Sequence, residues 1–205
     1  MLNIQNVHKT FNKGTINEKV ALNNLNLTLQ TGDFVTVIGG NGAGKSTMLN
    51  MIAGVYPVDK GQIIIDGVDV TRQPDYKRAT YLGRVFQDPM MGTAADMEIQ
   101  ENLAMASRRG KKRTLRWGIT AQEKKIYQEK LAQFDLGLEK RMSSKVGLLS
   151  GGQRQAITLL MATLQNPKVL LLDEHTAALD PKTAAKVLEI TEMIVNRDHL
   201  TTMMI

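Results

Sequence analysis

A glycine-rich stretch that ends in a lysine is the part of the sequence best suited to chemistry. It reads Gly39-Gly40-Asn41-Gly42-Ala43-Gly44-Lys45-Ser46-Thr47 and matches the pattern G-x-x-x-x-G-K-[ST]. Glycines let successive backbone N–H groups turn toward one centre, where they can hold phosphate oxygens. Lys45 would reach the terminal phosphates of a nucleotide, and the Ser46 hydroxyl would bind Mg²⁺. The alternative is a glycine-rich turn that binds no ligand.

Two adjacent carboxylates form the second candidate site. Asp173 and Glu174 follow Val169–Leu172, an uninterrupted apolar run of the kind expected for a buried parallel strand. Open α/β sheets bind their ligands at the carboxyl ends of strands. Asp173 would hold Mg²⁺ directly or through its water shell, and Glu174 could accept a proton from an attacking water. Ordinary surface acids are the alternative, which the upstream phosphate loop disfavours.

The segments around the glycine loop predict the elements that must position it. The apolar run 34–38 before the loop predicts a strand, and residues 48–53 after it predict a helix that ends at Gly54. Alternation over 2–7 and apolar residues from Val20 to Leu29 predict a β-rich, antiparallel opening. The chain is therefore expected to be an α/β protein with a strand, a phosphate loop and a helix in sequence.

The rest of the chain divides into predicted strands, helices and connections. Strands are expected at 61–65, 81–86 and from Thr201, helices around 99–106, 126–134, 155–164 and 182–196, and a polar connection at 69–77. Ser150 is a natural N-cap for the helix that follows it. The basic run 108–116 is expected to be a solvated loop, with a phosphate-rich partner or lipid headgroups as less favoured alternatives.

The composition excludes several classes of protein. The 205 residues include no cysteine, so disulfides and thiolate metal sites are excluded. No run of about 18 apolar residues is present, and the first residues lack the pattern of a signal peptide. The net charge is +6, but four Phe, four Tyr and one Trp provide few platforms for stacking nucleic-acid bases. We therefore expect no nucleic-acid partner.

Four motifs together resemble the ATP-binding subunit of ATP-binding cassette (ABC) transporters. They are the phosphate loop, the Q-loop glutamine Gln87, the signature Leu-Ser-Gly-Gly-Gln at 149–153, and the Walker B strand with Asp173 and Glu174. Residues 178–180, Ala-Leu-Asp, resemble the D-loop. The resemblance implies a P-loop NTPase core sheet with an antiparallel β subdomain and an inserted helical lobe. The implied parts of this single ABC ATPase domain are 1–33 (antiparallel), 34–89 and 161–205 (core) and 90–160 (lobe).

The resemblance also implies a role for each motif residue, with ATP and Mg²⁺ as cofactors. Lys45 and the loop amides would bind phosphates; Ser46, Gln87 and Asp173 would surround Mg²⁺. Glu174 would be the general base. The signature, Ser150, Gly151, Gly152 and Gln153, would cap the γ-phosphate held by a second, head-to-tail copy. From the residues alone, Phe11 is interpreted as an aromatic of the core or its rim. The resemblance replaces this interpretation, because Phe11 stands where the family places an aromatic that stacks on adenine.

The sequence departs from the family pattern at three points. His175 stands where a proline is common, and Met161 stands where an arginine is frequent, which would change the packing of the lobe. The family's switch histidine should follow the strand that begins at Thr201, and the sequence ends before it. We therefore expect this chain to fold its ATP site but to hydrolyse ATP poorly.

The function implied is ATP-driven solute transport through separate permease subunits, with the subunit peripheral on the cytoplasmic face of the membrane. The segments around Gln87 and 98–103 resemble bacterial importer subunits for amino acids or other small solutes, which work with an extracytoplasmic solute-binding protein. The alternatives are an exporter subunit, a non-transport ABC ATPase that acts on nucleic acid, and a nucleotide-binding module without hydrolysis. Glu174 argues against the last.

Overall fold

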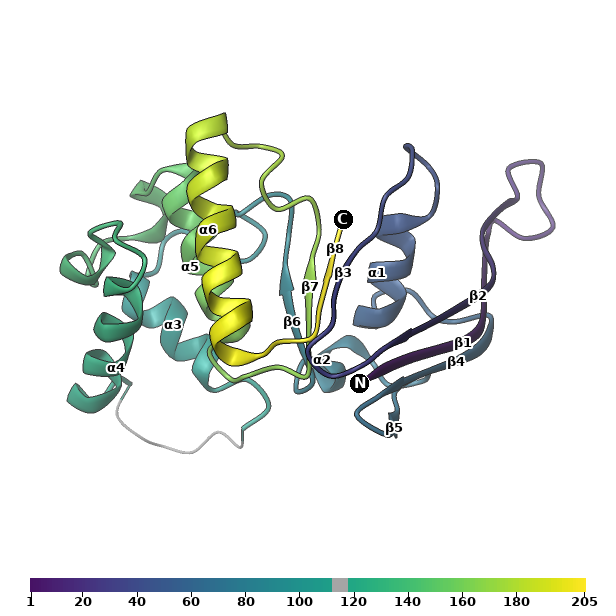
Figure 1. The fold of residues 1–205 in the computed structure, drawn as a ribbon, viewed down its shortest axis with the longest axis horizontal. Helices are drawn as coiled ribbons and strands as arrows, with labels where there is room; N and C mark the ends of the chain where they lie inside the picture. The colour runs from purple at the N-terminus through teal and green to yellow at the C-terminus, as the bar shows by residue number, and fades with distance from the viewer. Residues whose placement is uncertain (112–117) are drawn as a thin grey trace.

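Two four-stranded sheets organise the protein (Figure 1). The computed structural model describes residues 1–111 and 118–205. The antiparallel sheet contains β1 (Leu2–Phe11), β2 (Lys19–Leu29), β4 (Lys60–Ile65) and β5 (Val68–Asp69) in the order β2-β1-β4-β5. The parallel sheet contains β3 (Phe34–Thr36), β6 (Leu82–Val85), β7 (Val169–Leu172) and β8 (Thr202–Met204) in the order β3-β8-β7-β6.

The helices cover these sheets and build a lobe beside them. Within the described residues they are α1 (Lys45–Ala53), α2 (Asp75–Arg78), α3 (Ile99–Ser107), α4 (Ala121–Ala132), α5 (Gly151–Thr163) and α6 (Pro181–Asp198), with 3₁₀ turns at Leu138–Lys140 and Val146–Leu148. Figure 1 shows α1 between the two sheets, α5 and α6 on the other side of the parallel sheet, and α3 and α4 farther out. None of the helices described is both long and apolar enough to cross a membrane.

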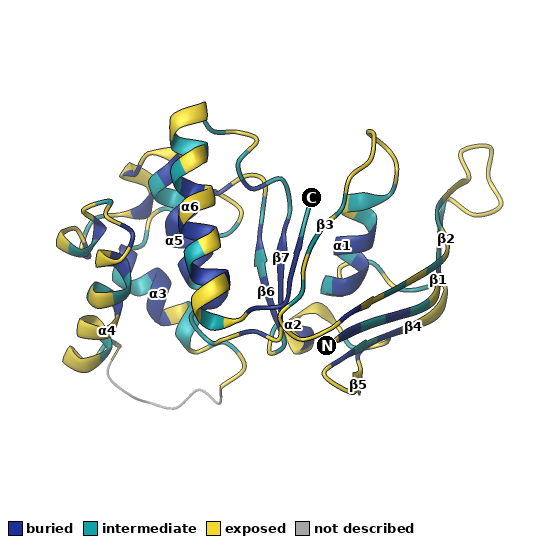
Figure 2. Cartoon of the chain, in the orientation of Figure 1, coloured by how far each residue is buried: buried dark blue, intermediate teal, exposed yellow. Residues whose placement is uncertain are grey.

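The centre of the parallel sheet is buried on both faces. Along β7, Val169 and Leu171 belong to the hydrophobic cluster that contains α1, whereas Leu170 and Leu172 belong to the cluster that contains α5 and α6. All four side chains are fully buried. Successive side chains of a strand point to opposite faces, so a strand covered on both sides must be apolar throughout. Figure 2 shows this buried layer in dark blue between the helices.

The expected α/β fold class is confirmed, with differences at element ends. β3 stops at Thr36, two residues before the predicted end, and α1 begins at Lys45 rather than Met48. The predicted polar connection 69–77 is wrong in part, because it contains the end of β5 and most of α2. The cause is Arg78, which is 1% exposed and donates hydrogen bonds to four carbonyl oxygens, those of Met51, Ile52, Thr71 and Gln73.

The lobe also differs in detail from the sequence prediction. α3 and α4 form as expected, but the apolar faces that their apolar residues predict do not include Met105 and Ile126, whose side chains are exposed. α5 runs without a break across residue 160 and begins at Gly151, four residues before the predicted start. In the basic run, Arg109 packs on α5 instead of being solvated, and residues 112–117 lie outside the described residues.

Candidate functional site

The phosphate loop connects β3 to α1 and is shaped by glycines with positive φ. Gly42 has φ 80° and Gly44, the N-cap of α1, has φ 90°. A Cβ on Gly44 would lie 2.6 Å from the Ala21 carbonyl oxygen, so β2 supports the loop closely at this point. Lys45 Nζ donates to the Gly39 oxygen at 2.6 Å and to the Gly40 oxygen at 3.2 Å. The Lys45 ammonium is thus held against the loop, and a glycine loop that leads into a helix N-terminus is the arrangement in which backbone amides can bind a polyphosphate.

The predicted magnesium ligands lie at the same edge of the parallel sheet as the loop. β6 and β7 are neighbours in register, with Val85 opposite Leu172, and the Asp173 amide donates to the Val85 carbonyl at 3.1 Å. Gln87 and Asp173 therefore follow adjacent strands at their carboxyl ends. With Ser46 they offer amide, carboxylate and hydroxyl oxygens, the types of donor that Mg²⁺ prefers. The residues present fit a magnesium ion that shares its coordination with nucleotide phosphates.

Glu174 has a backbone conformation that is unusual for its residue type. Its φ is 44°, in the left-handed region, and its carbonyl accepts a hydrogen bond from the Ala177 amide at 3.0 Å. Non-glycine residues in this region are uncommon and cluster at functional sites, where the surrounding structure holds them. The chain therefore turns sharply directly after Asp173, at the residue predicted to be the general base.

His175 anchors the segment that follows the carboxylates. It is 2% exposed, and its Nε2 lies 3.1 Å from Thr191 Oγ1 on α6. The Thr191 hydroxyl donates to the Val187 carbonyl at 2.8 Å, so it accepts from His175, which places the imidazole proton on Nε2. Burial lowers the pKa of His175 from 6.5 to about 4, because the charged ring would lose its hydration. The residue is therefore neutral at physiological pH.

Arg84 on β6 is a site residue that the sequence prediction missed. Its guanidinium lies 3.3 Å from the Asp173 carboxylate, and both side chains are 15% exposed. The guanidinium also stacks over the Phe86 ring at 4.6 Å. A charged residue inside a short apolar strand was the available signal, since buried charges are almost always paired. Arg84 therefore provides a counter-charge for the predicted magnesium carboxylate.

The signature residues have local structural roles that explain their types. The Ser150 hydroxyl accepts from the Gln153 amide, and the Gln153 side chain accepts from the Ser150 amide, both at 3.3 Å, which forms a capping box at the start of α5. A Cβ on Gly152 would lie 2.0 Å from Thr183 Cγ2 on α6, and one on Gly151 would lie 3.2 Å from a Leu179 methyl group. Glycines here let α5 approach α6.

The structure places the signature and the phosphate loop on different sides of the parallel sheet. The buried residues of α5 belong to one hydrophobic cluster and those of α1 to the other, and Figure 1 shows the two helices on opposite faces. The D-loop residue Asp180 caps α6 by accepting from the Thr183 amide at 3.1 Å. One copy of the chain therefore does not bring Ser150–Gln153 onto its own Lys45.

Phe11 is partly exposed at the end of β1. Its ring makes an edge contact with Tyr56, with centroids 5.3 Å apart and planes at 81°, and Lys9 Nζ lies 5.5 Å from its centroid. This position combines a packed edge with partial access to solvent. It is compatible with a stacking platform, and it is not a residue of the buried core.

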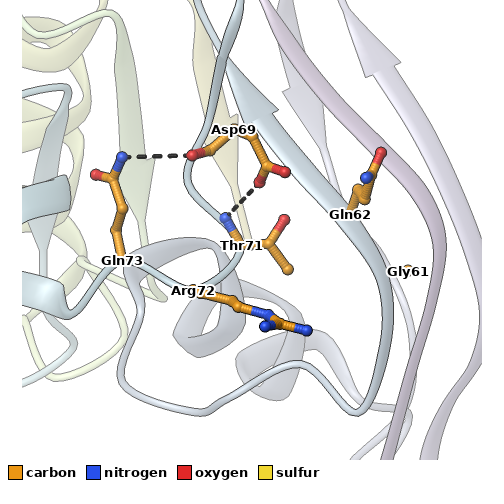
Figure 3. A pocket seen from close by; sticks show the side chains of 6 residues that line it. All are labelled: Gly61, Gln62, Asp69, Thr71, Arg72 and Gln73. Atoms are coloured by element: carbon orange, nitrogen blue, oxygen red, sulfur yellow. Dashed lines mark hydrogen bonds between the residues drawn. The ribbon is translucent and has the colours of Figure 1, made fainter.

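Two hollows are of interest among those that lie away from the phosphate loop in the described part of the chain. The one in Figure 3 is about 380 Å³ and is lined by Gly61, Gln62, Asp69, Thr71, Arg72 and Gln73. Its polar groups bond to one another: the Asp69 carboxylate accepts from the Thr71 amide and the Asp69 carbonyl from Gln73. The second, which we call the lobe groove, is about 610 Å³ and lies between α2, the β6 edge and the lobe.

Met161 lies beside the lobe groove, where the family often has an arginine. Its carbonyl and that of Ala162 accept hydrogen bonds from Arg109, at 3.4 and 3.2 Å. Burial lowers the pKa of Arg109 through desolvation of the guanidinium. An arginine therefore still packs beside α5 near Met161, but it is Arg109, which follows α3, and not a residue of α5 itself.

Comparison with known proteins identifies the family. Residues 22–177 match the family model described as ABC transporter. A tyrosine transport ATP-binding protein of Clostridioides difficile is 43% identical over 205 residues, which cover 100% of this chain and 81% of the relative. The spermidine/putrescine import ATP-binding protein PotA of Haemophilus influenzae is 34% identical over 202 residues, which cover 98% of this chain and 50% of PotA. The chain thus spans half of that second relative.

Solved structures agree with this assignment. The dimeric post-hydrolysis structure of the ATP-binding cassette MJ0796, bound to ADP and Pi, superposes with a TM-score of 0.82 at 31% identity, covering 100% of this chain and 87% of that one. The family resemblance and the cassette fold expected from the motifs are thereby confirmed. The chain belongs to the ABC transporter family and is an ATP-binding cassette ATPase.

Proposed function

We propose that this cassette powers the uptake of an amino acid or similar small solute through separate permease subunits. It would work on the cytoplasmic face of the membrane, with an extracytoplasmic protein that delivers the solute. The observation that carries this proposal is the 43% identity, along the whole chain, to a protein named for tyrosine transport. The import proteins for polyamines, phosphonates and methionine among its relatives support the direction of transport.

The proposed chemistry is attack of water on the γ-phosphate of ATP. Lys45 and the loop amides hold the phosphates and spread their charge, and Glu174 accepts the proton of the attacking water. Ser46, Gln87 and Asp173 would hold Mg²⁺, which when bound neutralises charge on the phosphate oxygens. The left-handed backbone conformation of Glu174 marks a sharp turn directly after Asp173, which supports separate roles for the two acids.

The proposed active unit is a head-to-tail dimer in which each copy lends its signature to the other. The placement of α1 and α5 on opposite faces of the sheet supports this arrangement. Because the chain has no cysteine, Asn41→Cys and Ser150→Cys can each be introduced alone. We expect a disulfide between the two variants when they are mixed with ATP in a Glu174→Gln background. If each variant crosslinks only with itself, this arrangement is wrong.

The lobe groove is the proposed docking site for a permease helix. Four apolar side chains of its lining are exposed, and they are Val55, Tyr76, Met91 and Met105. Lys111 and Arg108 line the same groove, and Arg108 is paired with Glu123 at 3.2 Å. The lining contains more basic residues than acidic ones, of which Asp75 is one, so the matching helix should carry acidic residues beside its apolar face. Met91→Glu should reduce recovery of the permease with the tagged cassette from detergent-solubilised membranes. Ile126→Glu, an exposed apolar residue on α4, is the matched control and should not.

Uptake in the native cell tests the function itself. Cells that carry Lys45→Ala at the native locus should lose import of one radiolabelled amino acid, because the loop lysine binds the phosphates that drive the cycle. Restoring the wild-type gene should restore import. Normal import of every amino acid, together with accumulation of a solute that wild-type cells expel, would instead identify an exporter.

A further inference from the structure

Lys19 begins β2 and faces the same side of the antiparallel sheet as Phe11. The two residues are direct partners in the β1–β2 pair. Side chains directly opposite in an antiparallel pair project from the same face and lie next to each other. If Phe11 stacks on adenine, Lys19 therefore stands beside the base, on the adjacent strand.

The Lys19 ammonium reaches the phosphate loop from this position. A Cβ on Gly42 would lie 3.5 Å from Lys19 Nζ, and Gly42 is one of the two loop glycines with positive φ. Strand β2 has a bulge at Ala21, because Val20 and Leu22 pair with the consecutive residues Thr10 and Lys9 of β1. The Ala21 carbonyl is the atom that packs against Gly44. Bulges are frequent where a strand must aim side chains at a site.

We propose that Lys19 is a second phosphate-binding cation of the nucleotide site. It approaches the polyphosphate from β2, whereas Lys45 approaches from α1. A nucleotide with its base on Phe11 and its phosphates in the loop must pass over Lys19. The ligand class is a nucleoside di- or triphosphate, and the inference rests on the proposed nucleotide site. The carboxylate of the neighbouring Glu18 accepts from the Gly14 amide at 2.6 Å within the hairpin, so its hydrogen bond is made to the turn and not to this ammonium.

A different role for Lys19 makes a different prediction. β2 is an edge strand of its sheet, and lysines on edge strands discourage pairing with another chain. A lysine retained only for that reason would be indifferent to ATP. The affinity for nucleotide therefore separates the two roles.

The test is ATP affinity, measured by isothermal titration calorimetry in excess EDTA, so that neither hydrolysis nor magnesium contributes. Lys19→Gln should raise the Kd for ATP by about three- to tenfold, as expected for the loss of one exposed charged contact. It should also reduce the dependence of that Kd on KCl. Lys19→Arg, which keeps the charge, should bind within about twofold of wild type. Lys124→Gln on α4 removes the same charge from an exposed position in the lobe and should leave the Kd unchanged.

The outcomes distinguish failure of the Lys19 inference from failure of the proposed nucleotide site at the phosphate loop. Wild-type affinity in Lys19→Gln, or an equal loss in Lys124→Gln, overturns the role of Lys19. Lys45→Ala in the same assay should abolish detectable binding. If Lys45→Ala binds ATP as wild type does, the assignment of the phosphate loop fails, and the inference about Lys19 fails with it. If only Lys45→Ala is impaired, the site remains and the second cation is refuted.

Discussion

The buried neutral His175 makes the stability of the nucleotide-free protein depend on pH. Burial lowers its pKa from 6.5 to about 4 in the folded chain, whereas the unfolded chain takes up the proton near the ordinary value. Between these two pKa values the unfolded state binds more protons, so the free energy of unfolding falls as the pH falls. The loss approaches about 1.4 kcal/mol per pH unit and totals about 3 kcal/mol. Between pH 7 and pH 5 it amounts to about 2 kcal/mol.

Urea unfolding at a series of pH values measures this effect. The assay uses EDTA and no nucleotide, so that only the protein's own groups titrate. His175→Gln is the matched variant, because its amide can donate the same hydrogen bond to Thr191 and carries no charge. We expect the wild-type free energy of unfolding to fall by about 2 kcal/mol between pH 7 and pH 5, and most of that fall to disappear in the variant. An equal fall in both proteins would refute the role of His175.

Four single variants, one of them also combined with a second substitution, test other parts of the structure. Gly61→Ala should cost at least about 2 kcal/mol in urea unfolding, because its φ is 93° and a Cβ would lie 2.4 Å from main-chain oxygens of β1. Arg78→Met should cost about 3 kcal/mol in the same assay, since four carbonyls lose their donor. Arg84→Met should destabilise the magnesium-free protein by about 2–4 kcal/mol, and adding Asp173→Asn should recover part of this loss. Glu174→Gln should keep ATP binding while phosphate release slows by about 10²–10⁴-fold; unchanged turnover would remove Glu174 from its role.

The candidate site could be predicted from the sequence because its parts are local. The phosphate loop and Asp173–Glu174 each follow an apolar strand directly, so their chemistry and their place at a strand end are readable together. The order of the strands supplies the rest, since carboxyl ends of parallel strands share one edge of the sheet. Ser150 was predictable as an N-cap for the same reason, and it forms a capping box with Gln153 within four residues, whereas the signature itself was identified by its resemblance to the family motif.

Contacts between distant segments were not predictable from local patterns. Arg84 pairs with Asp173, 89 positions later in the chain, and Arg78 caps the end of α1, 26 and 27 positions before it. Each of these contacts joins two different elements, and periodicity and turn signals describe only residues within one element. Such signals therefore cannot predict these contacts. The short helix α2 was missed for this reason: Arg78 is held by carbonyls of other segments, and that tertiary interaction fixes four residues whose own sequence resembles a polar connection.

Helix α6 contacts both the signature segment at Gly152 and the segment that carries Glu174 and His175. At one end, Thr183 packs against Gly152, so tightly that a Cβ there would overlap it. Two turns later, Thr191 holds His175, the residue after the strained Glu174. One helix, α6, thus packs against the signature and also holds the residue next to Glu174, the proposed general base. Since packed interiors shift as units rather than deform smoothly, a change at Glu174 on ATP binding should move α6 and the signature together.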